Sequence, residues 1–428
     1  MKNGTGETAL IRPRLYAVDV SELAFVQYPP VNFTAGCHEL RVVLGQTETS
    51  TCLLWPASAC GRAPFMLSLS PLSHNQAYKG AKAPQIPRPN EASVTSVTLF
   101  SPLPPYPNIM MRIAIAGGAG LGYLLAKELS EAANAYNVVV LSRCERPEYA
   151  ALDVQVMQVN YDDYTSLSYA LHGVNLVISI VSGNEQLNLI NAAAQSGVQL
   201  FVPSEFEGAL DKRPSENDQL DPASSSSQAR TLLRRCARSS QMKWTVFSCG
   251  VFMERFLPQG LGSLMIGYGK NLSDPGSYLL DMNSYTAEYV EKDARGRTVR
   301  VCMTSVYDVA RFVVAAIDLG PANWPREFTM RGDRLSVRDV VGQCGRALNA
   351  AFQLSQWQVA DLPQLVSGYY QQGDYGRVTF YQQLQATVEG RYDFGQTSLN
   401  DLVNSSPYID VQPRSFRQWL AEQFPPSA

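Results

Sequence analysis

Residues 113–129 read IAIAGGAGLGYLLAKEL, an apolar run followed by clustered glycines and then by leucines at helical spacing. The spacing places four leucines on one face of a helix: Leu121, Leu124, Leu125 and Leu129. A buried strand that turns through glycines into a helix is typical of dinucleotide-binding βαβ units, where backbone N–H groups at the helix N-terminus hold a pyrophosphate. The stretch therefore predicts both a fold and a class of ligand.

The sequence that follows repeats the same alternation of strand and helix. Apolar strands alternate with amphipathic helices, and we expect the strands at 112–117, 137–142, 154–159, 174–181, 199–204 and 244–249. Strand and helix in alternation predict an α/β fold with a Rossmann-type, doubly wound parallel sheet.

The first 108 residues differ from the rest. They hold 13 of the 26 prolines and no sustained apolar period. A first nucleotide-binding strand normally opens a domain, so we expect the domain to start at Met110 or Met111. Residues 1–109 are then a poorly ordered, mostly irregular extension or a translated upstream segment; a small extra domain is the alternative.

Composition excludes several classes of partner. The formal net charge of −3, with no basic stripe, argues against nucleic acid. No N-terminal apolar segment and no membrane-length run occurs, which predicts a soluble cytoplasmic protein, or a nuclear one if it is regulatory. Eight cysteines without a CxxC pair, with only three histidines, predict neither a metal site nor a disulfide framework.

The glycine turn departs from the standard patterns. Its order, GGxGxG, fits neither GxGxxG nor GxxGxxG, because the last glycine comes one position early and Tyr123 stands where the third glycine of GxxGxxG would be. We expect a tighter loop that weakens cofactor binding. The residues predicted to wrap the pyrophosphate are Gly117, Gly118, Ala119, Gly120, Leu121 and Gly122.

The end of the second strand predicts which dinucleotide is bound. Ser142 and Arg143 stand where an acidic residue would accept a hydrogen bond from the ribose of NAD, whereas arginine accommodates a 2′-phosphate. This predicts NADP(H). The alternative is that Arg143 is an ordinary exposed arginine.

Local catalytic motifs are missing. The sequence has no GxSxG elbow, HExxH or P-loop lysine, which leaves serine hydrolases, zincins and kinases without support. A Tyr-x-x-x-Lys pair occurs at Tyr78 and Lys82, inside the proline-rich region, and we interpret it as accidental.

Several later motifs agree in order and spacing: GVNLVISIVSG (173–183), LINAAAQSGV (189–198), LFVPSEFEG (200–208), WTVFSCGVFMERF (244–256), MTSVYDVARFVVAAID (303–318) and RSFRQWL (414–420). Together they resemble the isoflavone-reductase-like or NmrA-like family of atypical short-chain dehydrogenases, and fungal members in particular. The resemblance covers residues 110 to about 425. It implies a dinucleotide-binding part at about 110–250 and a smaller α/β substrate lobe built mainly from about 251–428.

The resemblance also implies site residues. Asp162 would lie near the adenine, and Val181 and Ser182 beneath the ribose. The nicotinamide and the substrate would be bordered by Pro203, Ser204, Glu205, Phe206, Cys249, Gly250, Phe252, Met253 and Phe256. Core packing is the equal alternative for Phe252, Met253 and Phe256, and fixing the turn through backbone hydrogen bonds is the alternative for Glu205.

The family's acid/base lysine aligns with Arg230. Arginine stays protonated, so it stabilises an oxyanion but donates a proton poorly. The alternative is an exposed helix arginine. Lys212 would substitute only if its polar loop folds back.

Two functions remain open at this point. One is an NADPH-dependent reductase of a small aromatic or polyketide-like metabolite, in which Arg230 stabilises negative charge. The other, which the missing lysine favours, is a non-catalytic NADP(H)-binding redox sensor of the NmrA type that acts through a regulatory protein partner.

Overall fold

The computed structural model describes residues 111–214, 225–267 and 271–425, together with the backbone of four short strands before them. Contacts divide the chain into two units, 1–109 and 110–428. In the first unit, β1 (Glu39–Val43) pairs antiparallel with β4 (Val94–Thr98), and β2 (Leu53–Leu54) with β3 (Phe65–Met66). The predicted disorder of 1–109 and the Tyr78–Lys82 pair lie outside the residues described in full.

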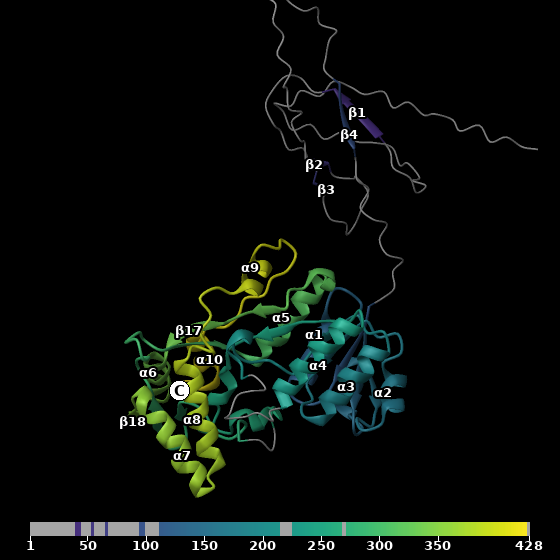
Figure 1. Ribbon diagram of the computed structural model, residues 1–428. Coiled ribbons are helices and arrows are strands. Elements are labelled where there is room, and N and C mark those ends of the chain that lie inside the picture. The colour runs from purple at the N-terminus through teal and green to yellow at the C-terminus, as the bar shows by residue number, and fades with distance from the viewer. Residues whose placement is uncertain are drawn as a thin grey trace, which may run out of the picture. The chain divides into compact units, whose positions relative to one another are not determined.

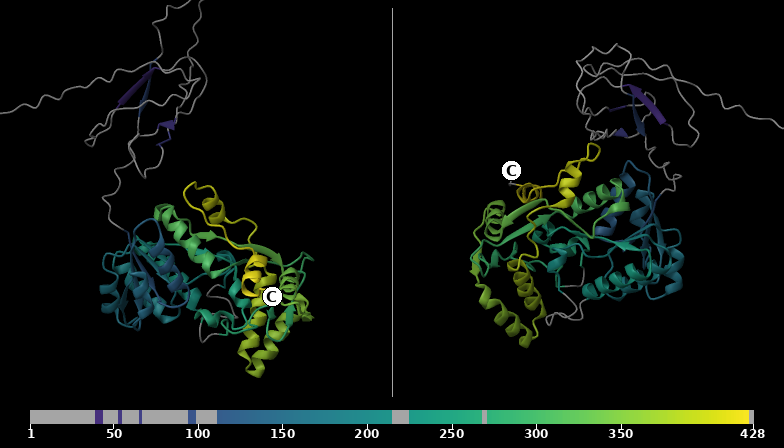
Figure 2. Two further views of the ribbon diagram at one scale, coloured as in Figure 1. Left: turned by 180° about the vertical axis from the view of Figure 1, so that it is seen from behind. Right: turned by 45° about the horizontal axis from the view of Figure 1, so that its top comes forward.

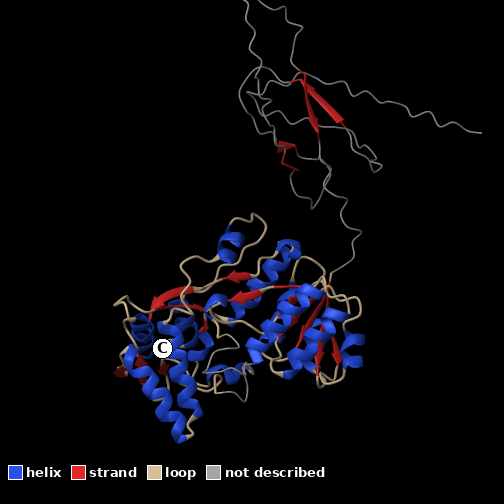
Figure 3. Cartoon of the chain, in the orientation of Figure 1, coloured by secondary structure: helices blue, strands red, loops and turns tan. Residues whose placement is uncertain are grey.

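The second unit contains the predicted sheet (Figure 3). Six parallel strands lie in the order β10-β9-β8-β5-β6-β7, which confirms the doubly wound topology. The chain runs outward from β5 to β7 and then crosses back to β8, so the crevice between the carboxyl ends of β5 and β8 is where such sheets bind ligands. The strands are β5 (Arg112–Ala116), β6 (Asn137–Ser142), β7 (Gln155–Gln158), β8 (Leu176–Ser179), β9 (Leu200–Val202) and β10 (Lys243–Trp244).

Alternating side chains separate the two faces of this sheet. Ile113 and Ile115 pack into one core with α1 (Leu121–Glu131) and α5 (Val306–Asp318). Ala114 and Ala116 pack into another, with α2 (Tyr164–Ala170), α3 (Asn184–Gln195) and α4 (Ser225–Ser239). Both faces are therefore covered by helices (Figure 1).

The strand expected at 244–249 is two strands in the structure. Trp244 ends β10, whereas β11 (Val246–Ser248) pairs with β16 (Glu327–Thr329) in a separate two-stranded sheet. Between them, the Thr245 hydroxyl donates to the Pro325 carbonyl at 2.7 Å. The chain therefore leaves the main sheet at Thr245, although Phe247 of β11 still packs into the core that α1 and α5 share.

The second lobe has its own core, which includes Phe256, Tyr381 and Trp419. In both views of Figure 2 its yellow-green helices α7 and α8 lie at the opposite end of the unit from the blue strands of the main sheet. Its elements are β12 (Val251–Phe252), β13 (Leu280–Asp281), β14 (Thr286–Tyr289), β15 (Arg300–Thr304), β17 (Asp333–Ser336), α6 (Val337–Leu348), β18 (Gln353–Gln356), α7 (Leu362–Gln372), α8 (Tyr375–Val388) and α10 (Phe416–Gln423). Helix α9 (Ser398–Asn404) packs instead into the core that α1 and α5 share, through Leu399 and Val403.

Candidate functional site

The glycine turn lies at the carboxyl edge of the sheet, at the predicted crevice. Gly117 has φ +106° and its N–H donates to the Leu141 carbonyl of β6 at 2.9 Å. A Cβ on Gly117 would lie 3.3 Å from the Val181 side chain, which follows β8. The turn therefore joins the ends of β5, β6 and β8, and the structure brings Gly117 and Val181 together.

Gly122 explains the unusual spacing. A Cβ on Gly122 would lie 1.9 Å from the Gly117 carbonyl oxygen, a distance that no side chain tolerates. In the GxGxxG pattern the last glycine allows the helix to pack closely on the strand. Gly117 and Gly122 keep the first-to-last separation of that pattern, so Gly122 performs this packing role although the middle glycine is displaced.

The first turn of α1 fits a pyrophosphate. Its N-cap is Gly120, at φ +56°, with no side-chain cap, and no acidic residue lies in the first turn. Backbone N–H groups at a helix N-terminus and the positive end of the helix dipole favour a bound anion, although the Gly122 N–H already donates to the Ala119 carbonyl at 3.0 Å. The second lobe reaches this turn, because a Cβ on Gly120 would lie 2.8 Å from both the Leu264 carbonyl and the Ile266 side chain.

Strand β6 ends at Ser142, as predicted, and presents Arg143 beyond it. The Ser142 side chain is buried, whereas the Arg143 side chain is 72% exposed and forms an ion pair with Glu185 of α3 at 2.7 Å. An exposed guanidinium at this edge is accessible to a ligand. Its partner Glu185, however, competes for it.

The sequence reasoning missed Arg146. Its Nε donates to the Ser142 hydroxyl at 3.3 Å, and a Cβ on Gly118 would lie 3.4 Å from the Arg146 side chain. Tyr149 fixes the other side of the turn, since its hydroxyl donates to the Gly118 carbonyl at 2.9 Å, and burial raises the pKa of this tyrosine. Arg146 lies only three residues beyond Arg143, in the run SRCER, and that second arginine was the available signal.

The other predicted cofactor positions follow the same edge. Val181 and Ser182 come directly after β8 and are half-buried. Asp162 is exposed beyond β7, where its carboxylate accepts from Asn188 at 3.4 Å. Among the described residues, Asp162 forms no hydrogen bond or ion pair with the glycine turn, and its role beside an adenine stays a prediction.

The segment after β9 is held rigidly. The Ser204 N–H donates to the Gln186 side chain of α3 at 2.7 Å, and Pro203 is buried. The Phe206 ring stacks on the Phe247 ring, with 6.2 Å between the ring centroids. These contacts fix the turn beside β8.

Glu205 is at the centre of a buried ionic cluster. Its carboxylate accepts from Arg213 at 2.8 Å and from Arg230 at 3.1 Å, and the other carboxylate oxygen has no hydrogen-bond partner among the described residues. The Arg213 side chain is fully buried and also donates to the Gly208 carbonyl and to Ser248. Sequence reasoning missed Arg213 because a charged loop residue carries no local signal of burial.

Arg230 is placed inside the protein rather than on the helix surface. Besides Glu205, its guanidinium donates to the Ser226 hydroxyl at 2.6 Å and to the Pro214 carbonyl, and the side chain is 4% exposed. Lys212 points elsewhere, since its ammonium donates to the Gly390 carbonyl at 3.0 Å. The catalytic role of Arg230 stays a prediction, and its protein partners already occupy part of its donor set.

The residues predicted to line a substrate pocket are mostly buried. Cys249, Met253 and Phe256 belong to the hydrophobic cores, and Phe252 is half-buried against one of them. Burial raises the pKa of the Cys249 thiol to about 12, so it is a neutral thiol. Gly250 has φ +73°, and a Cβ there would lie 2.1 Å from the Cys302 carbonyl oxygen.

Residues 111–214, 225–267 and 271–425 contain no group of three or more metal-ligating side chains, and the five cysteines in these ranges are free. No described helix has the length and apolar character needed to cross a bilayer.

Comparisons with known proteins agree with this geometry. The NmrA-like family profile matches residues 110–396. Oxidoreductase BOA1 of Botryotinia fuckeliana is 32% identical over 248 residues, which cover 55% of this chain and 76% of that protein.

Two solved structures share the fold. AtPrR2 with NADP+ and (+)pinoresinol has a TM-score of 0.55 at 18% identity, covering 73% of this chain and 98% of that one. The NADPH complex of the NADPH-dependent quinone oxidoreductase QOR2 from Escherichia coli has a TM-score of 0.52 at 16% identity, and the match covers 73% of this chain and 99% of that one. The chain belongs to the NmrA-like family.

Proposed function

We propose that this protein is an NADPH-dependent reductase of a small aromatic or polyketide-like metabolite. The observation that carries the proposal is the uncapped N-terminus of α1 behind a glycine turn, with two arginines at the end of the adjacent strand. Membership of the NmrA-like family, whose fold neighbours were solved with NADPH or NADP+, supports NADP(H) as the cofactor.

Each part of the site has a binding role. The N–H groups at the start of α1 bind the pyrophosphate, and Gly122 keeps that helix end against β5. Arg143 and Arg146 hold the 2′-phosphate, because planar guanidinium groups donate in pairs to phosphate oxygens. The rigid Pro203–Phe206 turn borders the nicotinamide, and the bound cofactor supplies the hydride.

Glu185 tunes the selectivity. In the structure its carboxylate takes the Arg143 guanidinium at 2.7 Å, and a bound 2′-phosphate has to share that guanidinium. Arg146 has a weaker competitor, since Glu148 lies 3.6 Å from it. Arg146 is therefore the better placed of the two to receive a phosphate.

The proposed substrate class is inferred from proteins of similar structure. The solved neighbours act on or bind a quinone and pinoresinol, both ring compounds. Phe252 and Phe206 are the half-buried aromatic side chains that border the proposed nicotinamide position and would contact such a ring.

Calorimetric titration of the full chain with NADPH and with NADH tests the cofactor assignment. We expect NADPH to bind more tightly, and Arg146→Gln to weaken NADPH binding by roughly 10-fold or more while leaving NADH binding unchanged, because a charge-assisted bond contributes about 1.5–3 kcal/mol. Arg295→Gln, an exposed change far along the sequence, is the charge-matched control. Equal affinities for both dinucleotides would overturn the 2′-phosphate assignment.

A screen for NADPH consumption with small aromatic carbonyl compounds and aryl ethers tests the reductase assignment. Turnover above the no-enzyme rate supports it, whereas tight NADPH binding with no turnover across the panel favours the second candidate.

That second candidate is a non-catalytic NADP(H)-binding redox sensor. The burial of Arg230 against Glu205, Ser226 and the Pro214 carbonyl favours it, because a guanidinium so engaged has few donors left for a substrate oxyanion. Linkage requires such a sensor to bind its protein partner with different affinities in the NADPH and NADP+ forms. Equal partner affinities in the two forms would exclude it.

A further inference from the structure

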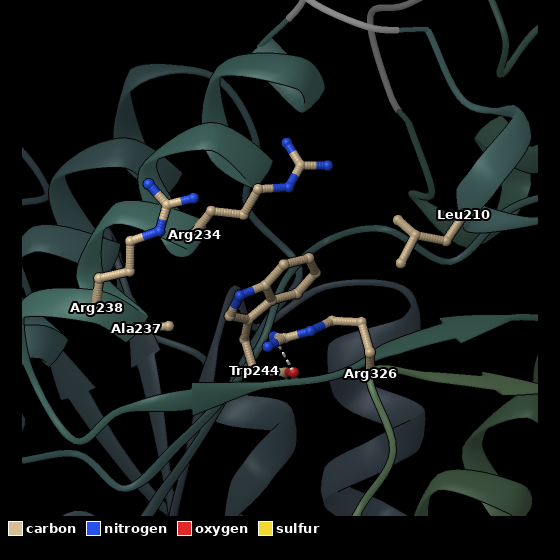
Figure 4. Close-up of a pocket in the computed structure, with 6 residues that line it drawn as sticks. All are labelled: Leu210, Arg234, Ala237, Arg238, Trp244 and Arg326. Atoms are coloured by element: carbon tan, nitrogen blue, oxygen red, sulfur yellow. Dashed lines mark hydrogen bonds between the residues drawn. The ribbon is translucent and has the colours of Figure 1, made fainter.

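A second pocket lies beside the edge strand β10, and none of its lining residues belongs to the glycine turn or its neighbours. Its volume is about 380 Å³, within the range of small-molecule sites. Figure 4 shows that the side chains come from α4, from the end of β10, from the segment before β16 and, for Leu210, from the short 3-10 helix Leu210–Lys212. The lining residues are Leu210, Arg234, Ala237, Arg238, Trp244 and Arg326.

Three arginine side chains line this pocket, and Arg234 and Arg238 are exposed there. Arg234 and Arg238 are one helical turn apart on α4, and Arg326 approaches from the opposite wall (Figure 4). Within the described ranges, none of the three forms an ion pair with a carboxylate, although arginines elsewhere in the unit do. Like charges at this spacing repel one another, so the arrangement favours an anionic ligand that neutralises them.

The carboxylate next to Arg326 in the sequence is already engaged. Glu327 follows Arg326, and its Oε1 accepts from the Leu210 N–H at 2.8 Å and from the Ser248 hydroxyl at 2.6 Å. Those two bonds direct Glu327 to the backbone and to β11. The guanidinium groups of the pocket are left to a ligand.

The floor of the pocket is preorganised. Trp244 is 3% exposed, and the Arg326 guanidinium stacks 3.9 Å from its ring centroid while donating to the Trp244 carbonyl at 2.6 Å. Burial, and after it the nearby charge of Arg234, lower the pKa of Arg326. A stacked arginine needs little further ordering to bind phosphate.

A second polar group at the pocket is unsatisfied. The Trp244 indole Nε1 is buried and has no hydrogen-bond partner among the described residues. Buried N–H groups in native structures nearly always have partners, so an orphan beside three unpaired cations is consistent with a missing acceptor. Leu210 and Ala237 make the remaining wall apolar.

We propose that this pocket binds the phosphoryl group of a small molecule, with Arg234, Arg238 and Arg326 as the donors. The site is separate from the dinucleotide site, since β9 and β8 lie between β10 and the strand that carries the glycine turn. Free phosphate and an organic phosphate monoester both present phosphoryl oxygens that these guanidinium groups can bind. The apolar wall formed by Leu210 and Ala237 favours the monoester.

Line broadening of the ³¹P signal of inorganic phosphate and of phenyl phosphate, titrated with the full chain, measures this binding. The test variant is Arg234→Gln/Arg238→Gln. The charge-matched control is Arg235→Gln/Arg295→Gln, because both of these arginines are exposed and neither lines the pocket. Phosphate bound at the glycine turn contributes equally in all three proteins.

We expect the test variant to bind phenyl phosphate about 10-fold more weakly than the wild type, and the control to differ by less than about twofold. Tighter binding of phenyl phosphate than of inorganic phosphate would identify an organic monoester as the ligand, and equal binding would identify free phosphate. The proposal is overturned if the two double variants lose binding equally, or if the wild type broadens neither signal. Unfolding curves of both variants separate lost binding from lost folding.

Discussion

Gly122→Ala tests whether the glycine turn works through close packing of α1 on β5. The new Cβ would lie 1.9 Å from the Gly117 carbonyl oxygen, whereas a C···O contact needs about 3.3 Å, so the helix start has to move by roughly 1.4 Å. Both clashing groups are fixed to the backbone, Gly122 is buried and Gly117 is half-buried, and overpacking of this kind costs roughly 3 kcal/mol. Alanine returns about 1 kcal/mol of helix propensity, which leaves a net loss of about 2 kcal/mol.

Binding should suffer as well as stability. The displaced helix end carries the N–H groups proposed to hold the pyrophosphate, and a misplacement of about 1 Å costs on the order of 10²-fold. Urea unfolding gives the stability loss, and calorimetric titration with NADPH gives the change in affinity.

Gly368→Ala is the matched control. Gly368 is also a helical glycine, in α7, but a Cβ there meets nothing within 4 Å. We expect this control to be neutral or up to about 1 kcal/mol more stable, with unchanged NADPH binding. If Gly122→Ala unfolds at the wild-type urea concentration and binds NADPH as the wild type does, the packing role of Gly122 is refuted.

Three further substitutions test the rest of the site. Glu185→Gln removes the carboxylate that occupies Arg143, and calorimetry should show NADPH binding tightened several-fold with NADH unchanged; weaker NADPH binding would contradict the competition. Glu205→Gln leaves two buried guanidinium groups without their carboxylate and should lower the free energy of unfolding by about 3–5 kcal/mol, against less than about 1 kcal/mol for the surface change Glu131→Gln. Arg230→Lys should raise the rate of NADPH oxidation with an accepted substrate, because a lysine in a desolvated cleft donates a proton and arginine does not. No change in that rate, or a lower rate, would mean that residue 230 does not contact the reacting groups.

The sheet could be predicted closely from sequence. Strands β5 and β6 occupy the expected apolar runs because parallel strands covered on both faces are almost continuously hydrophobic. The glycine cluster likewise predicted the position of the ligand-binding crevice from local sequence alone, because it directly follows the first strand of the sheet. The split at Thr245 escaped prediction because WTVFSC is one apolar run, and only its pairing with β16, about eighty residues later, divides it.

The burial of charged residues, in contrast, could not be predicted from the sequence. Arg213 and Arg230 look like loop and helix-surface arginines in the sequence, yet both are buried around Glu205. Their burial depends on three segments that meet only in the folded chain. The arginines of the β10 pocket escaped for the same reason, since Arg326 is brought to Trp244 by tertiary contacts alone.

The position of α5 has a consequence for how the protein is assembled. This helix comes more than fifty residues after the last strand of the main sheet, yet it lies beside α1 and contributes Val309 and Val313 to the core under β5. The apolar face formed by Ile113 and Ile115 is thus completed by a part of the chain that is synthesised late. A nascent chain ending near residue 250 would lack α5 and leave part of that face exposed to water, so the half that contains the main sheet cannot mature as an independent module and must wait for the later part of the chain to fold with it.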